Sequence, residues 1–238
     1  MEDFERINEL KRKRRLERKR KRRKKLLLNI ALCSSMIMIL LSIATLFLKT
    51  EGNEKEVKHE KELTHKVETM PAVDVRLLPE NEYSRPGTEL KEVKGVVVHY
   101  TGNPGTTAMQ NRNYFAGLAE TKTTKASSHY IIGLSGEIIQ CVPLNEIAYA
   151  SNQRNADTIS IECCIDNEAG KFNDKTYDAL VHLTAWLVGK YELTVSDIIR
   201  HYDVTGKICP KYFVEHESAW DDFKLDVEKY IDTHGVKK

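Results

Sequence analysis

Short apolar runs alternate with helical patterns along the second half of the chain. Five runs predict β-strands, at Gly95–Tyr100, His129–Gly133, Glu137–Val142, Thr158–Ile165 and Asp197–His201. Apolar residues with helical spacing predict helices over Thr107–Leu118, Asn173–Tyr191 and Trp220–Ile231. A Leu134-Ser135-Gly136 turn joins the second and third runs as a hairpin. This order predicts an α/β fold in one domain, with a central mixed β-sheet flanked by helices.

A different pattern occupies the N-terminal part, where residues 26–48 are predominantly apolar and carry no charge. As a helix rising about 1.5 Å per residue, this segment would span roughly 34 Å, which is enough to cross a hydrocarbon core. A cleaved signal peptide is the alternative. The run is longer than a signal-peptide core, and no clear cleavage site follows it. The pattern therefore predicts one transmembrane helix that precedes the folded domain.

The distribution of charged residues predicts how this helix is oriented in the membrane. The whole chain has a net charge of only +2, but Lys and Arg are concentrated in Lys11–Lys25, and the rest is acidic on balance. Such a run could bind nucleic acid. Next to a membrane-spanning helix it is better explained as a cytoplasmic anchor that also favours anionic lipids, so we expect no nucleic-acid partner. Everything after residue 48 is then expected on the outer face of the cell membrane.

These patterns predict five sections along the chain. They are a basic cytoplasmic tail (1–25), the transmembrane anchor (26–48), a stalk with an extended lead-in (49–92), the folded domain (93–231) and a C-terminal tail (232–238). Residues 49–66 are rich in Glu and Lys and offer no apolar face, which predicts a stalk. The lead-in after them contains Val73, Val75, Leu77 and Leu78, which suggest that it packs along the domain.

Three residues near the ends of apolar runs are candidate metal ligands. The apolar run of the first predicted strand stops at His99, another predicted strand ends at His201, and Cys209 follows eight positions later. Ligands of open α/β sheets gather where strands end. Two imidazoles and a thiolate can hold Zn²⁺ in a tetrahedral site with one position left for water. Taken singly, each residue is weak evidence, because a lone histidine at a strand end is more often structural and a lone cysteine is more often a small buried hydrophobe.

Hydrolysis at such a site also needs a proton acceptor and a positive charge. Glu162 lies within an otherwise apolar strand, where a carboxylate is costly to bury without a partner or a purpose. The alternative is an edge strand with Glu162 facing water. Lys207 stands two positions before Cys209, although it could also be an ordinary solvated lysine of a loop.

Four motifs around these residues resemble those of one enzyme family. They are VVVHYTG at His99, SSHYIIGLSGEIIQ over the hairpin, NADTISIE at Glu162, and RHYDVTGKICP at His201 and Cys209. In this order the chain resembles, from about Val93 to Lys229, the zinc-dependent N-acetylmuramoyl-L-alanine amidases of the second amidase class. That class is related to T7 lysozyme and the peptidoglycan-recognition proteins. The tail, anchor and stalk have no counterpart in this resemblance.

The resemblance implies an amidase/PGRP-like fold and a peptidoglycan hydrolase. Its reaction would be zinc-dependent cleavage of the amide between the lactyl group of N-acetylmuramic acid and L-alanine of the stem peptide. His99, His201 and Cys209 match the metal positions, Glu162 the carboxylate that activates water, and Lys207 the lysine that stabilises the intermediate. The chain departs from the phage-type pattern at Ser128, where a catalytic tyrosine is expected. The histidine that follows it, His129, is present, but three protein ligands already suffice.

Two other functions remain open on the same fold. A non-catalytic module would bind muropeptides without cutting them, and a zinc endopeptidase would cut within the stem peptide. The cysteines also leave alternatives: Cys141 could pair with Cys163 or Cys164 outside the cell, or all three could be core residues. Adjacent strand residues face opposite ways, so only one of Cys163 and Cys164 could reach a given partner.

Overall fold

The computed structural model describes residues 63–237, and within them six strands form one mixed sheet in the order β2-β5-β4-β6-β3-β7. The strands are β2 (Asp74–Val75), β3 (Val96–Tyr100), β4 (Tyr130–Ile132), β5 (Ile138–Gln140), β6 (Ile159–Cys163) and β7 (Ile198–Arg200). β3 runs parallel to β6 and β7, and β4 runs parallel to β6. β5 is antiparallel to β4, as the hairpin predicted, and β2 joins the edge of β5. The predicted mixed α/β sheet is confirmed.

Helices connect and cover these strands. They are α2 (Ala108–Thr121), α3 (Asp174–Lys190), α4 (His201–Thr205), α5 (Lys211–Glu215) and α6 (Glu217–His234), with short 3-10 turns η1 (Asn152–Ala156) and η2 (Val195–Asp197). Side-chain capping hydrogen bonds stabilise the N-termini of two helices at the positions predicted from the sequence. Thr107 and Gln110 form a capping box at α2, and Asn173 accepts a hydrogen bond from the Thr176 amide at α3. α6 continues beyond the predicted end at Ile231.

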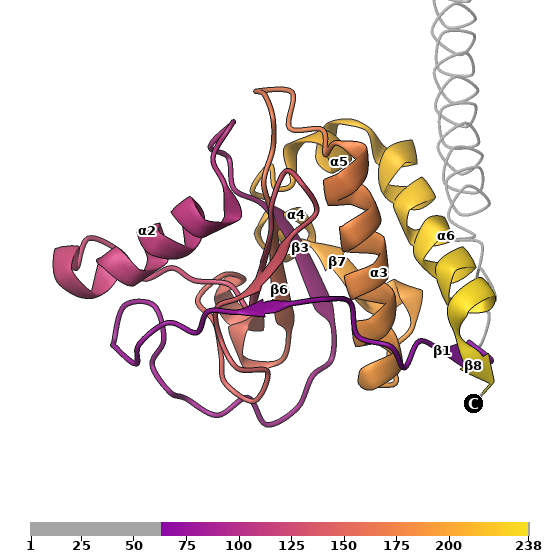
Figure 1. Ribbon diagram of the computed structural model, residues 1–238, viewed down its shortest axis with the longest axis horizontal. Coiled ribbons are helices and arrows are strands. Elements are labelled where there is room, and N and C mark those ends of the chain that lie inside the picture. The colour runs from indigo at the N-terminus through magenta and orange to yellow at the C-terminus, as the bar shows by residue number, and fades with distance from the viewer. Residues whose placement is uncertain (1–62, 238) are drawn as a thin grey trace, which may run out of the picture. The chain divides into compact units, whose positions relative to one another are not determined.

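The two faces of the sheet differ in polarity, and the candidate site residues lie on the more polar face. α3 and α6 lie together on one side of the sheet, and α2 lies on the other (Figure 1). Side chains alternate along β6, so Ile159, Ile161 and Cys163 enter the core under α3 and α6. The residues between them, Ser160 and Glu162, point to the opposite face.

That opposite face is only partly covered by apolar residues. Phe115 and Leu118 of α2 form a second, smaller core with Ile131 and Ile139 of the hairpin strands. His99, on β3, stands directly beside Glu162 of β6 in the parallel register. Because neighbouring strands lie about 4.8 Å apart, these two polar side chains share one small area of the sheet.

The lead-in packs more extensively than the sequence predicted. Leu63 and Val67 are buried in the core under α3 and α6, so the residues described from 63 to 66 are not a free stalk. β1 (His65–Lys66) pairs antiparallel with β8 (Val236–Lys237), which links the lead-in to the C-terminal end. Of the four apolar residues expected to pack along the domain, Val73 and Leu78 contact the core. The other two, Val75 and Leu77, are exposed.

The transmembrane prediction falls on residues that the structure does not describe. Residues 1–62 include the basic tail, the apolar segment 26–48 and most of the predicted stalk. Within residues 63–237, no helix is long and apolar enough to cross a membrane. The anchor and its orientation therefore stay predictions from the sequence.

The four cysteines of the described residues are free and buried. Cys163 lies in the core under α3 and α6, whereas Cys164 lies with Cys141 in the core on the α2 side. The predicted opposite orientation of Cys163 and Cys164 is confirmed. Cys141, Cys163 and Cys164 are small core residues in this structure, and the pairing alternative is not found among the described residues.

Candidate metal centre

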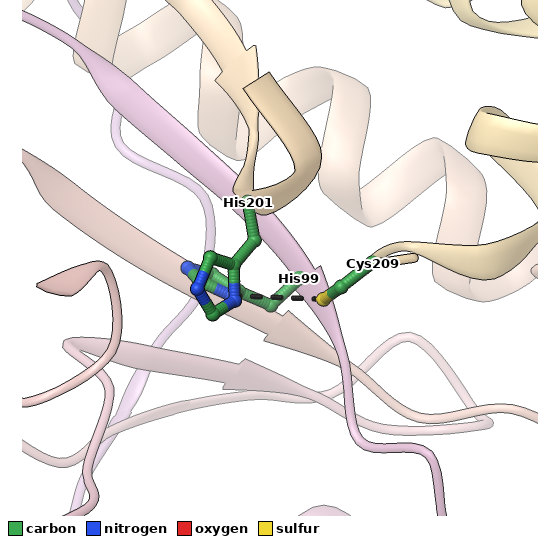
Figure 2. A group of neighbouring side chains, drawn as sticks. All are labelled: His99, His201 and Cys209. Atoms are coloured by element: carbon green, nitrogen blue, oxygen red, sulfur yellow. Dashed lines mark hydrogen bonds between the residues drawn. The ribbon is translucent and has the colours of Figure 1, made fainter. Parts of the chain in front are cut away.

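Three separate elements bring His99, His201 and Cys209 together. His99 is the fourth residue of β3, His201 is the first residue of α4 directly after β7, and Cys209 lies in the loop between α4 and α5. One donor atom from each residue lies within 4.8 Å of the other two (Figure 2). His99 Nδ1 is 3.8 Å from Cys209 Sγ, and the two imidazole centroids are 4.8 Å apart. Within residues 63–237, this is the group of His, Cys, Asp and Glu side chains close enough to hold a metal ion.

Burial keeps both imidazoles neutral, which is the form that binds a metal. It lowers the pKa of His99 well below its usual value, and the charges of His201 and Lys207 lower it further. The pKa of His201 is lowered for the same first reason, with Lys207 again contributing. Burial raises the pKa of the Cys209 thiol to about 12, and Glu162 adds to this rise. A cation at this point would compensate the thiolate, since metal binding displaces the proton.

The donor set fits a zinc ion of the catalytic type. Two neutral imidazoles and one buried thiol match the ligands that Zn²⁺ prefers, and three protein ligands leave a position open. The three residues line a cavity of about 350 Å³, so that open position would face a space that substrate can enter. A closed structural site would have four protein ligands and no cavity.

Glu162 lies on a central strand and lines the same cavity. The edge-strand alternative for this residue is therefore wrong, because β6 is paired on both sides. Its Oε2 is buried and has no hydrogen-bond partner among the described residues. Burial raises the pKa of Glu162 to about 8, and the charge of Lys207 opposes the rise. Leaving a buried polar oxygen without a partner is costly, which favours a functional role for Glu162 over a purely structural one.

Lys207 is exposed at the rim of the cavity. Its positive charge reaches the whole group, because it lowers the pKa of His99, His201, Glu162 and Cys209. The structure thus brings all five predicted site residues to one cavity.

The two hairpin residues that the sequence left undecided are structural. His129 is buried, its Nδ1 accepts a hydrogen bond from the Ser160 amide at 3.0 Å, and its Nε2 donates to the Glu146 carbonyl oxygen at 2.9 Å. Both ring nitrogens are thereby occupied, and His129 does not belong to the metal-donor group. The Ser128 hydroxyl is buried against the carbonyl oxygens of Tyr130 and Ser160, so it does not replace the expected tyrosine.

Other residues of the site were not found from the sequence. Tyr149, Lys125 and Phe115 line the cavity, and Lys125 lies over the Tyr149 ring at 5.7 Å from its centroid. Ser151 and Asn152 touch the two histidines. Phe115 lies on the predicted helix α2, whereas Lys125, Tyr149 and Ser151 lie in irregular segments and Asn152 begins the short turn η1, so only the folded chain brings them to the site.

Comparison with known proteins agrees with this geometry. The model of the N-acetylmuramoyl-L-alanine amidase family matches residues 89–212, slightly more than half of the chain. All five candidate site residues lie within that match. The chain belongs to this family.

Curated relatives carry the same family name. The chain is 36% identical over 171 residues to the N-acetylmuramoyl-L-alanine amidase CwlL of Bacillus licheniformis, across 66% of this chain and 47% of that protein. It is 35% identical over 182 residues to the N-acetylmuramoyl-L-alanine amidase BlyA of Bacillus subtilis, across 68% and 48% respectively. The chain thus spans about half the length of the curated relatives it matches.

Solved structures extend the likeness to the fold. A mutant endolysin from Bacillus subtilis superposes with a TM-score of 0.56 at 27% identity, over 66% of this chain and 99% of that one. The part of this chain that matches therefore corresponds to nearly the whole of that solved chain.

Proposed function

We propose that this protein is a zinc-dependent N-acetylmuramoyl-L-alanine amidase that hydrolyses peptidoglycan. The bond cut is the amide between the lactyl group of N-acetylmuramic acid and L-alanine of the stem peptide. The observation that carries the proposal is the convergence of His99, His201 and Cys209 beside the unpaired carboxylate of Glu162 in one open cavity. Membership of the amidase family supports the choice of bond.

The three donors would hold the metal, and the other two residues would handle protons and charge. When bound, a zinc ion polarises the amide carbonyl and lowers the pKa of a water molecule. Glu162 would accept a proton from the attacking water and return it to the leaving nitrogen of alanine as the carbon–nitrogen bond breaks. Lys207 supplies positive charge at the cavity rim, where it would favour the developing oxyanion.

Product analysis of a defined muropeptide digested by the full chain tests this proposal. An amidase releases a peptide with a new N-terminal alanine and leaves the sugar with a free lactyl carboxylate. New amines within the stem peptide would instead indicate an endopeptidase. Binding of the muropeptide without any product would indicate a non-catalytic module, and either result would contradict the proposal.

We also propose the location that the sequence indicates. Residues 26–48 would anchor the chain in the cell membrane, with the basic tail inside and the amidase domain facing the cell wall. Protease added to intact protoplasts should then digest the domain and spare the tail. Protection of the domain would contradict this orientation.

A further inference from the structure

Two consecutive residues, Ser151 and Asn152, each make a hydrogen bond to one of the metal-binding histidines. Ser151 Oγ lies 3.1 Å from His99 Nε2, and Asn152 Oδ1 lies 3.0 Å from His201 Nε2. Both contacts use the Nε2 atom, whereas Nδ1 of His99 is the nitrogen that faces Cys209. The two imidazoles are thus contacted in the same way by one short segment of chain.

The chemistry of these contacts decides which ring nitrogen carries the proton. An amide oxygen only accepts hydrogen bonds, so Asn152 requires the proton of His201 on Nε2. The lone pair of His201 is then on Nδ1. The Ser151 hydroxyl can donate or accept, and with the Nδ1 lone pair of His99 directed at Cys209 it accepts from His99 Nε2.

The segment that carries both residues is itself held in place. Asn155 Oδ1 accepts hydrogen bonds from the amides of Ala150 and Ser151, at 3.0 and 2.6 Å. Asn152 has a φ of +52°, a left-handed conformation that asparagine adopts more readily than most residues. Ser151 is buried with an exposed fraction of 1%. The two contacts therefore come from a segment whose backbone is held by Asn155, with the Ser151 side chain buried and Asn152 exposed.

We infer that Ser151 and Asn152 are positioning residues that fix both histidines in the Nε2–H tautomer and orient their Nδ1 atoms for the metal. The inference rests on the metal site of the proposed function, but it does not require that the site cuts an amide. Partners of this kind typically change metal affinity about 10- to 100-fold when removed.

Zinc affinity of the full chain, measured by competition with a chromophoric chelator, tests the inference. Ser151→Ala removes one contact. Asn152→Gly removes the other and favours the local backbone, because glycine adopts a positive φ without strain. We expect each variant to bind zinc about 10- to 100-fold more weakly than the wild type. Asn152→Asp keeps an acceptor oxygen and should stay within about threefold of the wild type.

Gln153→Ala is the matched control, because Gln153 belongs to the same turn but donates to the Val204 carbonyl oxygen of α4. It should also stay within about threefold of the wild type, since it leaves both imidazole contacts intact. Long-range nitrogen NMR of the metal-free chain gives a second measurement. His201 should show the Nε2–H tautomer in the wild type and a mixture of tautomers in Asn152→Gly.

Equal zinc affinity in the wild type, Ser151→Ala and Asn152→Gly would overturn the inference. A wild type that binds no zinc would overturn both the inference and the metal site of the proposed function. Affinity losses as expected in a protein that cuts no muropeptide would support the inference while contradicting the proposed amidase.

Discussion

The carboxylate of Glu162 combines burial with the lack of a hydrogen-bond partner. Its Oε2 is buried without a partner, beside His99 on the neighbouring strand. A structural carboxylate in the centre of a sheet would be expected to bind an arginine, a lysine or several amides. The position of Glu162 is therefore costly for folding, which is the reason we propose a role for it in proton transfer within the cavity.

Glu162→Gln tests this role directly. The substitution keeps the shape and removes the base, so we expect kcat to fall about 10²- to 10⁴-fold with zinc affinity little changed. Glu120→Gln, at the exposed end of α2, is the control and should keep normal turnover. Near-normal turnover of Glu162→Gln with zinc bound would show that another group accepts the proton.

His129 makes a different contribution, to stability rather than chemistry. Burial lowers its pKa to about 4, against which its contacts with Glu146 act weakly. In the unfolded chain its pKa returns to about 6.5, so between these values the unfolded state binds more protons. The stabilisation is complete above about pH 6.5 and is lost as the pH falls toward 4, by about 3 kcal/mol.

Urea unfolding across this pH range measures the effect. His129→Gln should be less stable than the wild type at pH 7, with a smaller loss of unfolding free energy between pH 6.5 and 4. His99 and His201 are also buried neutral and titrate in both proteins, so the difference between the two curves isolates His129. Parallel curves would contradict a neutral structural role.

The grouping of the three candidate metal ligands was predictable from the sequence, whereas the residues that contact them were not. His99 and His201 end apolar runs, and motifs surround all three donors. Ser151 and Asn152 reach the histidines only because β3, β7 and η1 meet in the folded chain. Polar residues of an irregular segment look alike before folding, so no pattern could distinguish these two.

At the scale of elements, the lead-in is an integral part of the domain. Leu63 of the predicted stalk and Val67 of the lead-in enter the core under α3 and α6, and β1, at the end of the predicted stalk, pairs with β8. Gly189 of α3 allows this approach, because a Cβ there would lie 3.1 Å from the Val67 amide nitrogen. Residues 63–66 contain a single apolar side chain among polar ones, which is why periodicity assigned them to a stalk.

Leu63→Ala in the full chain measures how much this packing contributes. A buried leucine truncated to alanine costs about 2–5 kcal/mol of unfolding free energy, and we expect a loss in this range. Glu68→Ala is the control, because Glu68 is exposed and forms only a surface ion pair with Lys66. Chemical unfolding that gives equal stabilities for both variants and the wild type would mean that the lead-in is a free stalk.

The main strands and helices were predictable because each has a strong local pattern. The apolar runs of β3 and β6 and the amphipathic pattern of α3 and α6 follow from their burial on the sheet. β2 and β8 could not be predicted in this way. Each is two residues long and exposed, and each forms only by pairing with a distant partner.

At the scale of the whole domain, one face of the sheet carries most of the hydrophobic core and the other face carries the candidate site. The face under α3 and α6 is apolar and carries most of the core. The other face bears His99 and Glu162, and α2 covers it only partly, which leaves the cavity of the candidate site. A polar group of this kind could not be placed on the first face without losing core packing.

The central claim is that the domain cuts an amide with a metal held by His99, His201 and Cys209. The measurement that tests it most directly is release of N-terminal alanine from a muropeptide after chelation and after reloading with zinc. We expect chelation to abolish release, one equivalent of zinc to restore it in the wild type, and no restoration in Cys209→Ala. Release that survives chelation, or that Cys209→Ala retains, would contradict the account.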